Sequence, residues 1–185
     1  MFRRSWILGS VAAALLVCGT ATAQTKQDEQ RAELRTRADE TLKALFEQVK
    51  GSKELYDKSK GYAVFAATKA GFIVTGGGGS GIAVDKATGT TSYMKMGTGG
   101  VGLGVGAKRY DMVILFETKE RLDNFIKGGW DSEAAAKAVA GKDAAGVESG
   151  FVDGEVIYTL GDKGLMASAD VSGTKFWLDE DLNKK

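Results

Sequence analysis

The stretch Gly99–Phe116, GGVGLGVGAKRYDMVILF, combines two patterns that decide the fold. In its first half, every even position from Gly100 to Gly106 is glycine, and the odd positions between them are apolar. Because a strand sends alternate side chains to opposite faces, this half predicts a strand with one apolar face and one bare face. The second half ends in Met112–Phe116, a continuous apolar run typical of a strand buried on both faces. The two halves together predict a hairpin in the core.

Glycine inside a strand costs stability and usually marks a bend or the close approach of another backbone. A row of glycines on one face therefore indicates that the sheet coils sharply there, or that another part of the chain packs directly on the bare face. We expect valine at either Gly102 or Gly104 to be severely destabilising. The row consists of Gly100, Gly102, Gly104 and Gly106.

The N-terminus, Met1–Ala23, has the three features of a secretory signal peptide. They are the basic pair Arg3 and Arg4, the apolar stretch Trp6–Val17, and the A-x-A site Ala21–Ala23. The apolar stretch is too short for a stable transmembrane helix. We expect cleavage after Ala23, with lipidation of Cys18 as the alternative. The protein is therefore expected to be exported, to the periplasm or the periplasmic face of a membrane.

The composition excludes several kinds of chemistry. The chain of 185 residues has no histidine and one cysteine, which cleavage after Ala23 would remove. Catalytic triads with histidine, the usual zinc sites and disulfides are therefore excluded. A formal net charge of +1 gives no reason to expect nucleic-acid binding. Asp111 and Glu117 flank the apolar run, but acids there are usually solvated or paired with neighbours such as Lys108 and Arg109. We expect no catalytic site, no metal and no cofactor.

Three regions follow one another: the signal peptide at 1–23, a helical segment at 24–60 and a β-rich domain at 61–185. The helical segment should end in a short second helix, Lys53–Ser59, with Ser52 as its cap. Because its polar face mixes acids with bases, we expect it to pack on the sheet rather than on a membrane. Its apolar stripe at helical spacing is Leu34, Ala38, Leu42, Leu45, Phe46 and Val49.

In the β-rich domain, short strands are expected on both sides of the glycine run Gly76–Gly81. This run matches the dinucleotide pattern G-x-G-x-x-G, but a strand-like stretch follows it instead of a helix, so we reject a nucleotide site. A turn at Asp85–Gly89 and a hairpin over Gly161–Gly164 are also expected. The expected strands are Tyr62–Ala66, Gly71–Thr75, Ile82–Val84, Thr90–Met96, Gly154–Leu160, Leu165–Ser172 and Thr174–Leu178.

The middle of the domain predicts a helical pair, Lys119–Lys127 with Thr118 as its N-cap, followed by Ala134–Ala140. The pattern does not place Lys142–Asp153. Together the elements predict an α+β fold. Its core is a coiled, glycine-rich antiparallel sheet, covered by the N-terminal helix and the middle helical pair; closure into a barrel stays open as an alternative.

Basic residues near the ends of the expected strands are the candidate binding residues. Lys108, Arg109 and Tyr110 follow the glycine strand, Lys163 lies at the tip of the last hairpin, and Lys69 precedes the glycine run. At one end of the sheet these residues would form a small basic patch with an aromatic edge, which suits an anionic lipid headgroup. The alternative is that they are ordinary solvated turn residues.

Three blocks of the sequence resemble the SYLF domain family, also called Ysc84 or DUF500. They are AGFIVTGGGGSGIAVD (Ala70–Asp85), GGVGLGVGAKRYDMVILFETKERLDNFI (Gly99–Ile126) and EVIYTLGDKGLMASADVSGTKF (Glu155–Phe176). Eukaryotic members bind phosphoinositide-containing membranes, and a fungal branch binds and bundles actin. The resemblance therefore implies a β-rich domain that binds lipid without being an enzyme.

The chain departs from those eukaryotic members in two ways. It has Thr91–Met96 where they carry a Trp-Ser-x-Pro element, and it contains no proline. It also starts with a bacterial-type export signal, so the resemblance does not carry actin bundling over to this chain. We expect its partner to be an anionic phospholipid or membrane surface of the cell envelope. The competing hypothesis is a structural or protein-interaction module of the envelope with a protein partner and no lipid site.

Overall fold

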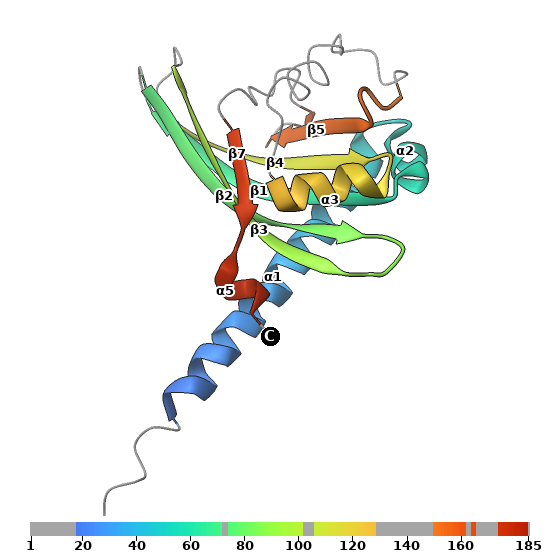
Figure 1. Ribbon diagram of the computed structural model, residues 1–185. Helices are drawn as coiled ribbons and strands as arrows, with labels where there is room; N and C mark the ends of the chain where they lie inside the picture. Colours follow the sequence, from blue (N-terminus) through green and yellow to red (C-terminus); the bar gives the residue numbers. More distant parts are fainter. Residues whose placement is uncertain are drawn as a thin grey trace, which may run out of the picture.

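A computed structural model describes residues 18–71, 74–101, 106–128, 150–161, 164–165 and 174–184 (Figure 1). Two helices come first, four long strands follow, and shorter elements complete the chain. In order, they are α1 (Cys18–Gln48), α2 (Ser52–Lys58), β1 (Gly61–Gly71), β2 (Val74–Asp85), β3 (Thr91–Val101), β4 (Gly106–Phe116), α3 (Lys119–Gly128), β5 (Glu155–Gly161), β6 (Gly164–Leu165), β7 (Thr174–Leu178) and α5 (Glu180–Asn183).

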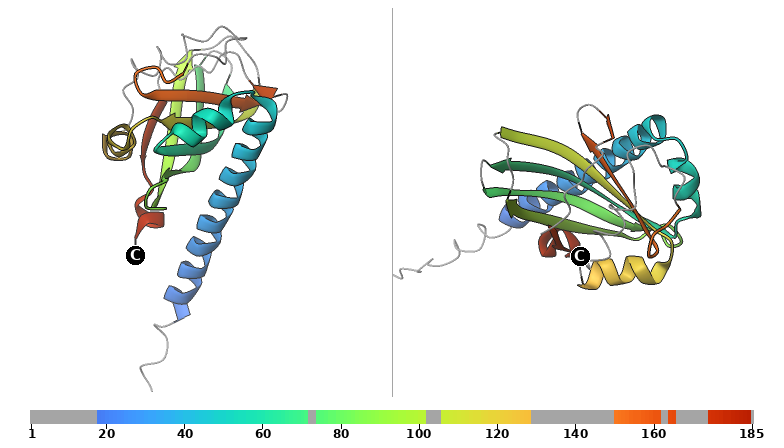
Figure 2. Two further views of the ribbon diagram at one scale, coloured as in Figure 1. Left: turned by 90° about the vertical axis from the view of Figure 1, so that its right-hand side faces the viewer. Right: turned by 90° about the horizontal axis from the view of Figure 1, so that it is seen from above.

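The strands form one seven-stranded sheet in the order β6-β5-β4-β1-β2-β3-β7, with every neighbouring pair antiparallel. The α+β prediction is confirmed. Within the described part of the chain the sheet is open, because β6 and β7 are its edges, so the barrel alternative is wrong for these residues. Figure 2 shows α1 along one face of the sheet and α3 on the other.

Each face of the sheet carries its own hydrophobic core. We call the face under α3 the inner face and the face under α1 the outer face. The inner core is built around Phe65, Met94, Met112, Phe116, Leu122, Phe125 and Phe176. The outer core is built around Ala38, Leu42, Leu45, Val64, Ile82, Tyr93, Val113 and Tyr158. Long buried strands that pack on both faces explain the continuous apolar run Met112–Phe116, in which all five residues are buried.

The sheet coils strongly toward its inner face. The rings of Phe65 on β1 and Phe176 on β7 lie 4.7 Å apart, centroid to centroid, although two strands separate β1 from β7. Strands in a flat sheet are about 4.8 Å apart, which would hold these two residues roughly 14 Å from each other. Phe125 of α3 lies 5.1 Å from Phe176 and completes the cluster. The inner face is therefore concave and the outer face convex.

The run Gly76–Gly81 lies inside β2, which corrects the prediction of separate strands around it. Its odd members point inward, where β1 approaches closely. A Cβ at Gly79 would collide with the carbonyl oxygen of Ala66 and lie 2.8 Å from Cα of Ala67, whereas a Cβ at Gly76 would meet nothing within 4 Å. In β2 a glycine face therefore meets the backbone of a neighbouring strand; the coil or close packing predicted for the row Gly100–Gly106 falls largely outside the described residues.

The prediction of a core hairpin within Gly99–Phe116 is wrong. The stretch is divided between the end of β3 and all of β4, and β1 and β2 lie between those two strands. Gly100 pairs with Thr75 and Gly106 with Gly71, while Gly102 and Gly104 fall outside the described residues. The pattern showed two strands, but the insertion of the β1–β2 hairpin between them leaves no local trace in the stretch itself.

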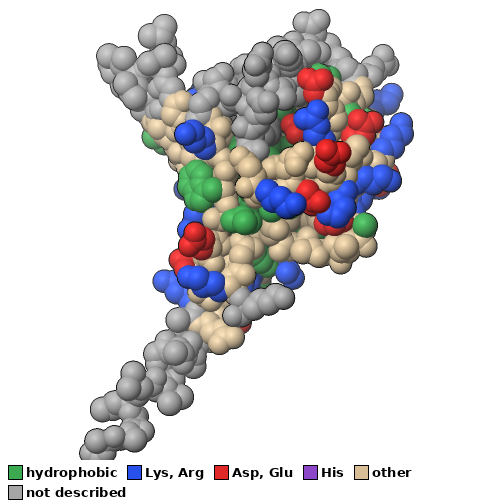
Figure 3. Space-filling view, in the orientation of Figure 1, with side chains coloured by type: hydrophobic (Ala, Val, Ile, Leu, Met, Phe, Trp, Pro, Cys, Tyr) green, Lys and Arg blue, Asp and Glu red, His purple; other side chains and the backbone are tan. Residues whose placement is uncertain are grey.

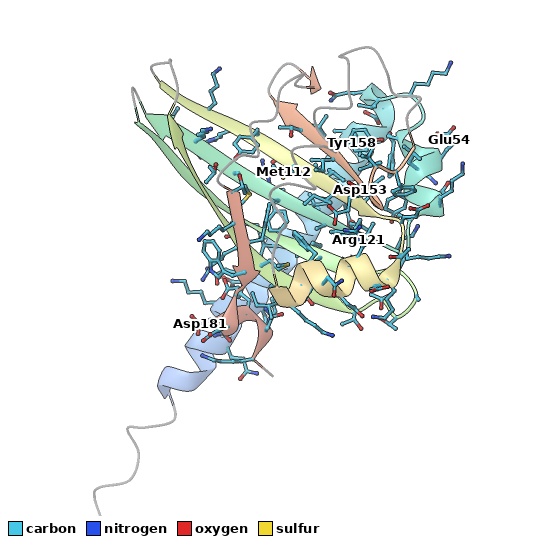
Figure 4. All side chains as sticks on the ribbon, turned by 45° about the horizontal axis from the view of Figure 1, so that its top comes forward. Glu54, Met112, Arg121, Asp153, Tyr158 and Asp181 are labelled. Carbon is cyan, nitrogen blue, oxygen red and sulfur yellow. The ribbon has the colours of Figure 1, made fainter. Side chains whose placement is uncertain are left out.

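The helices largely follow the predictions. Thr118 Oγ1 accepts a hydrogen bond from the Arg121 amide at 3.2 Å, which confirms it as the cap of α3. Arg121 also packs over Gly154, in the turn that contains Asp153 and leads into β5 (Figure 4). Ser52 is not a cap: its hydroxyl donates back to the carbonyls of Val49 and Leu45. The helix at Ala134–Ala140 falls outside the described residues.

The C-terminal segment closes the edge of the sheet. Strand β7 has the predicted bounds and pairs with β3. Asp179 caps α5 by accepting from the amides of Asp181 and Leu182. The side-chain amide of Asn183 then bonds to both backbone groups of Tyr93, and so extends the pairing of β3 beyond β7. Of the helices described, none is long and apolar enough to cross a membrane.

Candidate functional site

The structure brings Lys69 and Lys108 together. They are direct partners in the antiparallel pairing of β1 with β4, and both point to the inner face. Tyr110 follows on the same face of β4 and pairs with Gly161, the last residue of β5. Lys163 lies outside the described residues. Three of the five predicted binding residues therefore share one face at the end of the sheet remote from α2.

Arg109 is separated from this group because it lies on the outer face. The prediction placed Lys108–Tyr110 in a turn, where neighbouring side chains can point the same way. The structure places them inside β4, where side chains alternate between faces.

The pairing of Lys69 with Lys108 is electrostatically unfavourable by itself. Directly opposed residues in an antiparallel pair have Cβ atoms about 5 Å apart, and like charges at that distance are destabilising. Lys69 is half-buried and Lys108 is exposed. An anion at this position would interact with both ammonium groups, so the pair favours binding of a phosphate or carboxylate group.

Asp111 does not join this basic group. Its carboxylate accepts from Arg37 Nη2 at 2.8 Å and lies 3.4 Å from the hydroxyl of Thr41, so it fixes α1 to the outer face. This hydrogen bond with Asp111 is the main cause that raises the pKa of Arg37 above its ordinary value. The expectation that Asp111 pairs with a neighbour such as Lys108 or Arg109 is wrong, because its partner Arg37 lies 74 residues away in the chain.

The outer face carries two further exposed basic residues at the ends of one row: Arg109, which the sequence analysis named, and Lys175, which it missed. Successive pairings align one residue from each of five strands into a row across the sheet, which we call the outer row. It consists of Arg109 (β4), Thr68 (β1), Gly78 (β2), Gly97 (β3) and Lys175 (β7). All of these except the half-buried Gly97 are exposed. The row depends on the register of non-local strand pairs, so no short stretch of sequence reveals it.

Trp177 lies beside the outer row and is 48% exposed. Its indole ring covers Gly97, since a Cβ there would be 3.1 Å from Cη2 of the ring. In Figure 3 hydrophobic and basic side chains at the left lie over β7 with acidic side chains directly below them, and acidic and basic side chains alternate over α2 and α3. Among the described residues, no group of three or more His, Cys, Asp or Glu side chains is arranged to hold a metal ion.

These features describe an α+β domain with charged and aromatic groups carried on its strands. Residues 97–185 match the model of the Ysc84 family, described as "Las17-binding protein actin regulator". The chain carries a Ysc84 (SYLF) family domain, and the resemblance noted in its sequence is confirmed.

Named relatives come from bacteria, yeast and animals. "Beta cell expansion factor A" of Aeromonas veronii is 41% identical over 156 residues, which are 84% of this chain and 60% of the relative. "Protein YSC84" of Saccharomyces cerevisiae is 27% identical over 139 residues, 69% of this chain and 30% of the relative. The human "SH3 domain-containing YSC84-like protein 1" is 37% identical over 76 residues, 39% of this chain and 22% of the relative. The chain thus spans less than two thirds of each of these relatives.

Proposed function

We propose that this protein is a non-enzymatic domain that binds anionic lipid at the surface of the bacterial cell envelope. The observation that carries the proposal is the direct pairing of Lys69 with Lys108 on one face of the sheet. A phosphate headgroup beside the pair would be attracted by both ammonium groups. Lys and Arg near an anionic membrane each contribute about 1 kcal/mol to binding.

Two further features support the proposal. The export signal expected at residues 1–23 would bring the protein to an envelope membrane. Tyr110 follows Lys108 on the same face of β4, so an aromatic ring with a polar tip is available next to the pair, whereas Arg109 adds positive charge on the opposite face. Lys163 is the fifth residue that we propose for this surface.

Charge reversal tests this proposal. Lys108→Glu combined with Arg109→Glu is expected to weaken co-sedimentation with vesicles containing phosphatidylglycerol by at least about tenfold, because four units of charge change at the surface. The matched control is Lys43→Glu with Lys50→Glu, which makes the same change at exposed positions near the α2 end of α1. Equal binding by both double variants, with unfolding midpoints like the parent's, would contradict the assignment of these residues.

A second candidate function is protein binding in the envelope. The family description, which names Las17 and actin, favours it for the relatives. For an exported bacterial protein we propose neither of those partners, and we infer that such a partner would be another envelope protein. Vesicles without protein distinguish the two candidate functions. The lipid hypothesis requires that the purified protein bind them, whereas the protein-partner hypothesis does not.

A further inference from the structure

Two large hydrophobic side chains are exposed in the described part of the chain, and they are neighbours on β7. Trp177 is 48% exposed and Leu178 is 39% exposed. Because successive residues of a strand point to opposite faces, Trp177 lies on the outer face and Leu178 on the inner face. A partner that covered one face of the sheet would contact only one of these side chains. A partner added at the edge of the sheet would contact both.

Strand β7 forms one edge of the sheet. It pairs with β3 on one side, and within the described ranges no strand pairs with it on the other side. The backbone N–H and C=O groups on that side can therefore pair with an added strand. Natural edge strands are often protected by proline or by charges that point inward. This chain has no proline, and the inward side chains of β7 are the uncharged Thr174, Phe176 and Leu178.

The five residues of β7 complement themselves when two copies run antiparallel. With Phe176 of one copy opposite Phe176 of the other, Lys175 of each copy lies opposite Trp177 of the other, on the outer face. An ammonium group next to an indole ring is a favourable pair. On the inner face, Thr174 of each copy lies opposite Leu178 of the other. Each contact occurs twice, as a twofold-symmetric interface requires.

The charges around β7 also suit a second copy. The exposed Lys175 lies near the start of the strand, and the exposed acids Glu180 and Asp181 follow its end. Asp181 also accepts from Lys184 at 2.9 Å. An antiparallel copy brings the basic start of each strand toward the acidic end of the other, whereas a partner with charge of one sign would meet like charge at one end.

We propose that two copies of the protein associate edge to edge through β7, in antiparallel orientation, so that the two sheets continue into one. The inference goes beyond the proposed lipid binding and is independent of it, because the contact uses the edge of the sheet and leaves the Lys69–Lys108 pair out. Five residues from each copy bury less than the roughly 1,200 Å² of a stable interface, so we expect a weak, reversible dimer.

Sedimentation equilibrium tests for this dimer. The average mass of the parent protein should rise from one chain toward two chains between about 10 μM and about 1 mM. Lys175→Glu is expected to weaken association about tenfold, because it removes both contacts with Trp177. Lys127→Glu, which makes the same change at an exposed position of α3, is the control and should associate as the parent does. A mass of one chain throughout, or equal association by the two variants, would overturn the inference.

Cysteine pairs test the register of the two strands. With Cys18 replaced by serine, Lys175→Cys and Trp177→Cys are prepared as separate proteins. Opposed positions are close enough for a disulfide, whereas each position lies about 7–8 Å from its own counterpart in the other copy. Oxidation should therefore join the two proteins in a mixture and leave each protein alone as single chains. No disulfide in the mixture, or equal amounts with either variant alone, would overturn the proposed pairing.

Discussion

Gly79 shows how the backbone itself decides which residue a position accepts. Its neighbours across the β1–β2 pair are backbone atoms of Ala66 and Ala67, which cannot move aside as a flexible side chain can. Gly76 is in the same run but points to solvent on the convex face. Two glycines three positions apart therefore have opposite requirements, because they lie on opposite faces of the coiled sheet.

Valine at Gly79 is expected to destabilise the protein severely, by roughly 2–4 kcal/mol, because the strands must separate to admit it. Alanine at Gly76 is the control and should leave the free energy of unfolding unchanged or raise it slightly. Urea denaturation of the two variants and the parent measures both effects. A Gly79→Val protein as stable as the parent would show that β1 and β2 are not packed as described.

Tyr158 gives the protein a dependence on alkaline pH. Its side chain is buried in the outer core, and burial raises the pKa of Tyr158 to about 12 from an ordinary value of 10.0. The folded state therefore keeps its proton in a pH range where the unfolded chain has lost it. The contribution of Tyr158 to the free energy of unfolding is fully present below pH 10. It is lost as the pH rises toward 12, by up to roughly 3 kcal/mol.

Replacing Tyr158 with phenylalanine removes the titrating group. The loss of unfolding free energy between pH 9 and pH 11 should then be smaller in Tyr158→Phe than in the parent. Chemical denaturation at the two pH values measures this difference. The same loss in both proteins would mean that other groups cause the alkaline destabilisation.

At the scale of elements, the C-terminal segment holds the edge of β3. Asn183 donates to the carbonyl of Tyr93 at 2.7 Å and accepts from its amide at 3.0 Å, as a neighbouring strand would. Arg31 of α1 donates to the carbonyls of Leu182 and Lys184, so α1 and α5 are joined as well. This short segment therefore connects the first helix to the edge of the sheet.

Removal of the Asn183 side chain should loosen that connection. Asn183→Ala leaves the amide of Tyr93 without its partner, while the Tyr93 carbonyl keeps the hydrogen bond from the Asp179 amide, and is expected to cost about 2 kcal/mol. Asn124→Ala, at an exposed position of α3, is the matched control and should change stability by less than about 0.5 kcal/mol. The midpoints of urea unfolding measure the stability of the two variants. Equal midpoints would show that the Asn183 contacts contribute nothing to the stability of the fold.

Elements with a strong local pattern were predictable from the sequence. Thr174–Leu178 is rich in residues that favour strands, and Lys119–Lys127 begins with a good cap, so both appear where expected. The run Gly76–Gly81 was not predictable as strand, because glycine has no side chain with which to show a two-residue period. Ser52 had the composition of a cap, but its hydroxyl reaches back to the preceding helix turn.

At the scale of the whole molecule, topology decides which charges meet. The pairing of Lys69 with Lys108 joins residues 39 positions apart in the chain through the register of β1 with β4. Arg109, the next residue, faces the other way and shares the outer row with Lys175, from which three strands separate it. The candidate site was predictable as a list of basic residues near strand ends. Its division into two faces was not, because that depends on strand pairing over long distances.

The most direct test of lipid binding uses the unmodified protein. Co-sedimentation with neutral vesicles and with vesicles containing phosphatidylglycerol, at low and at physiological salt, separates electrostatic from apolar attraction. We predict binding that requires the anionic lipid and weakens as salt is added. Absence of binding to either kind of vesicle at both salt concentrations would contradict the proposed function and leave an envelope protein as the partner to seek.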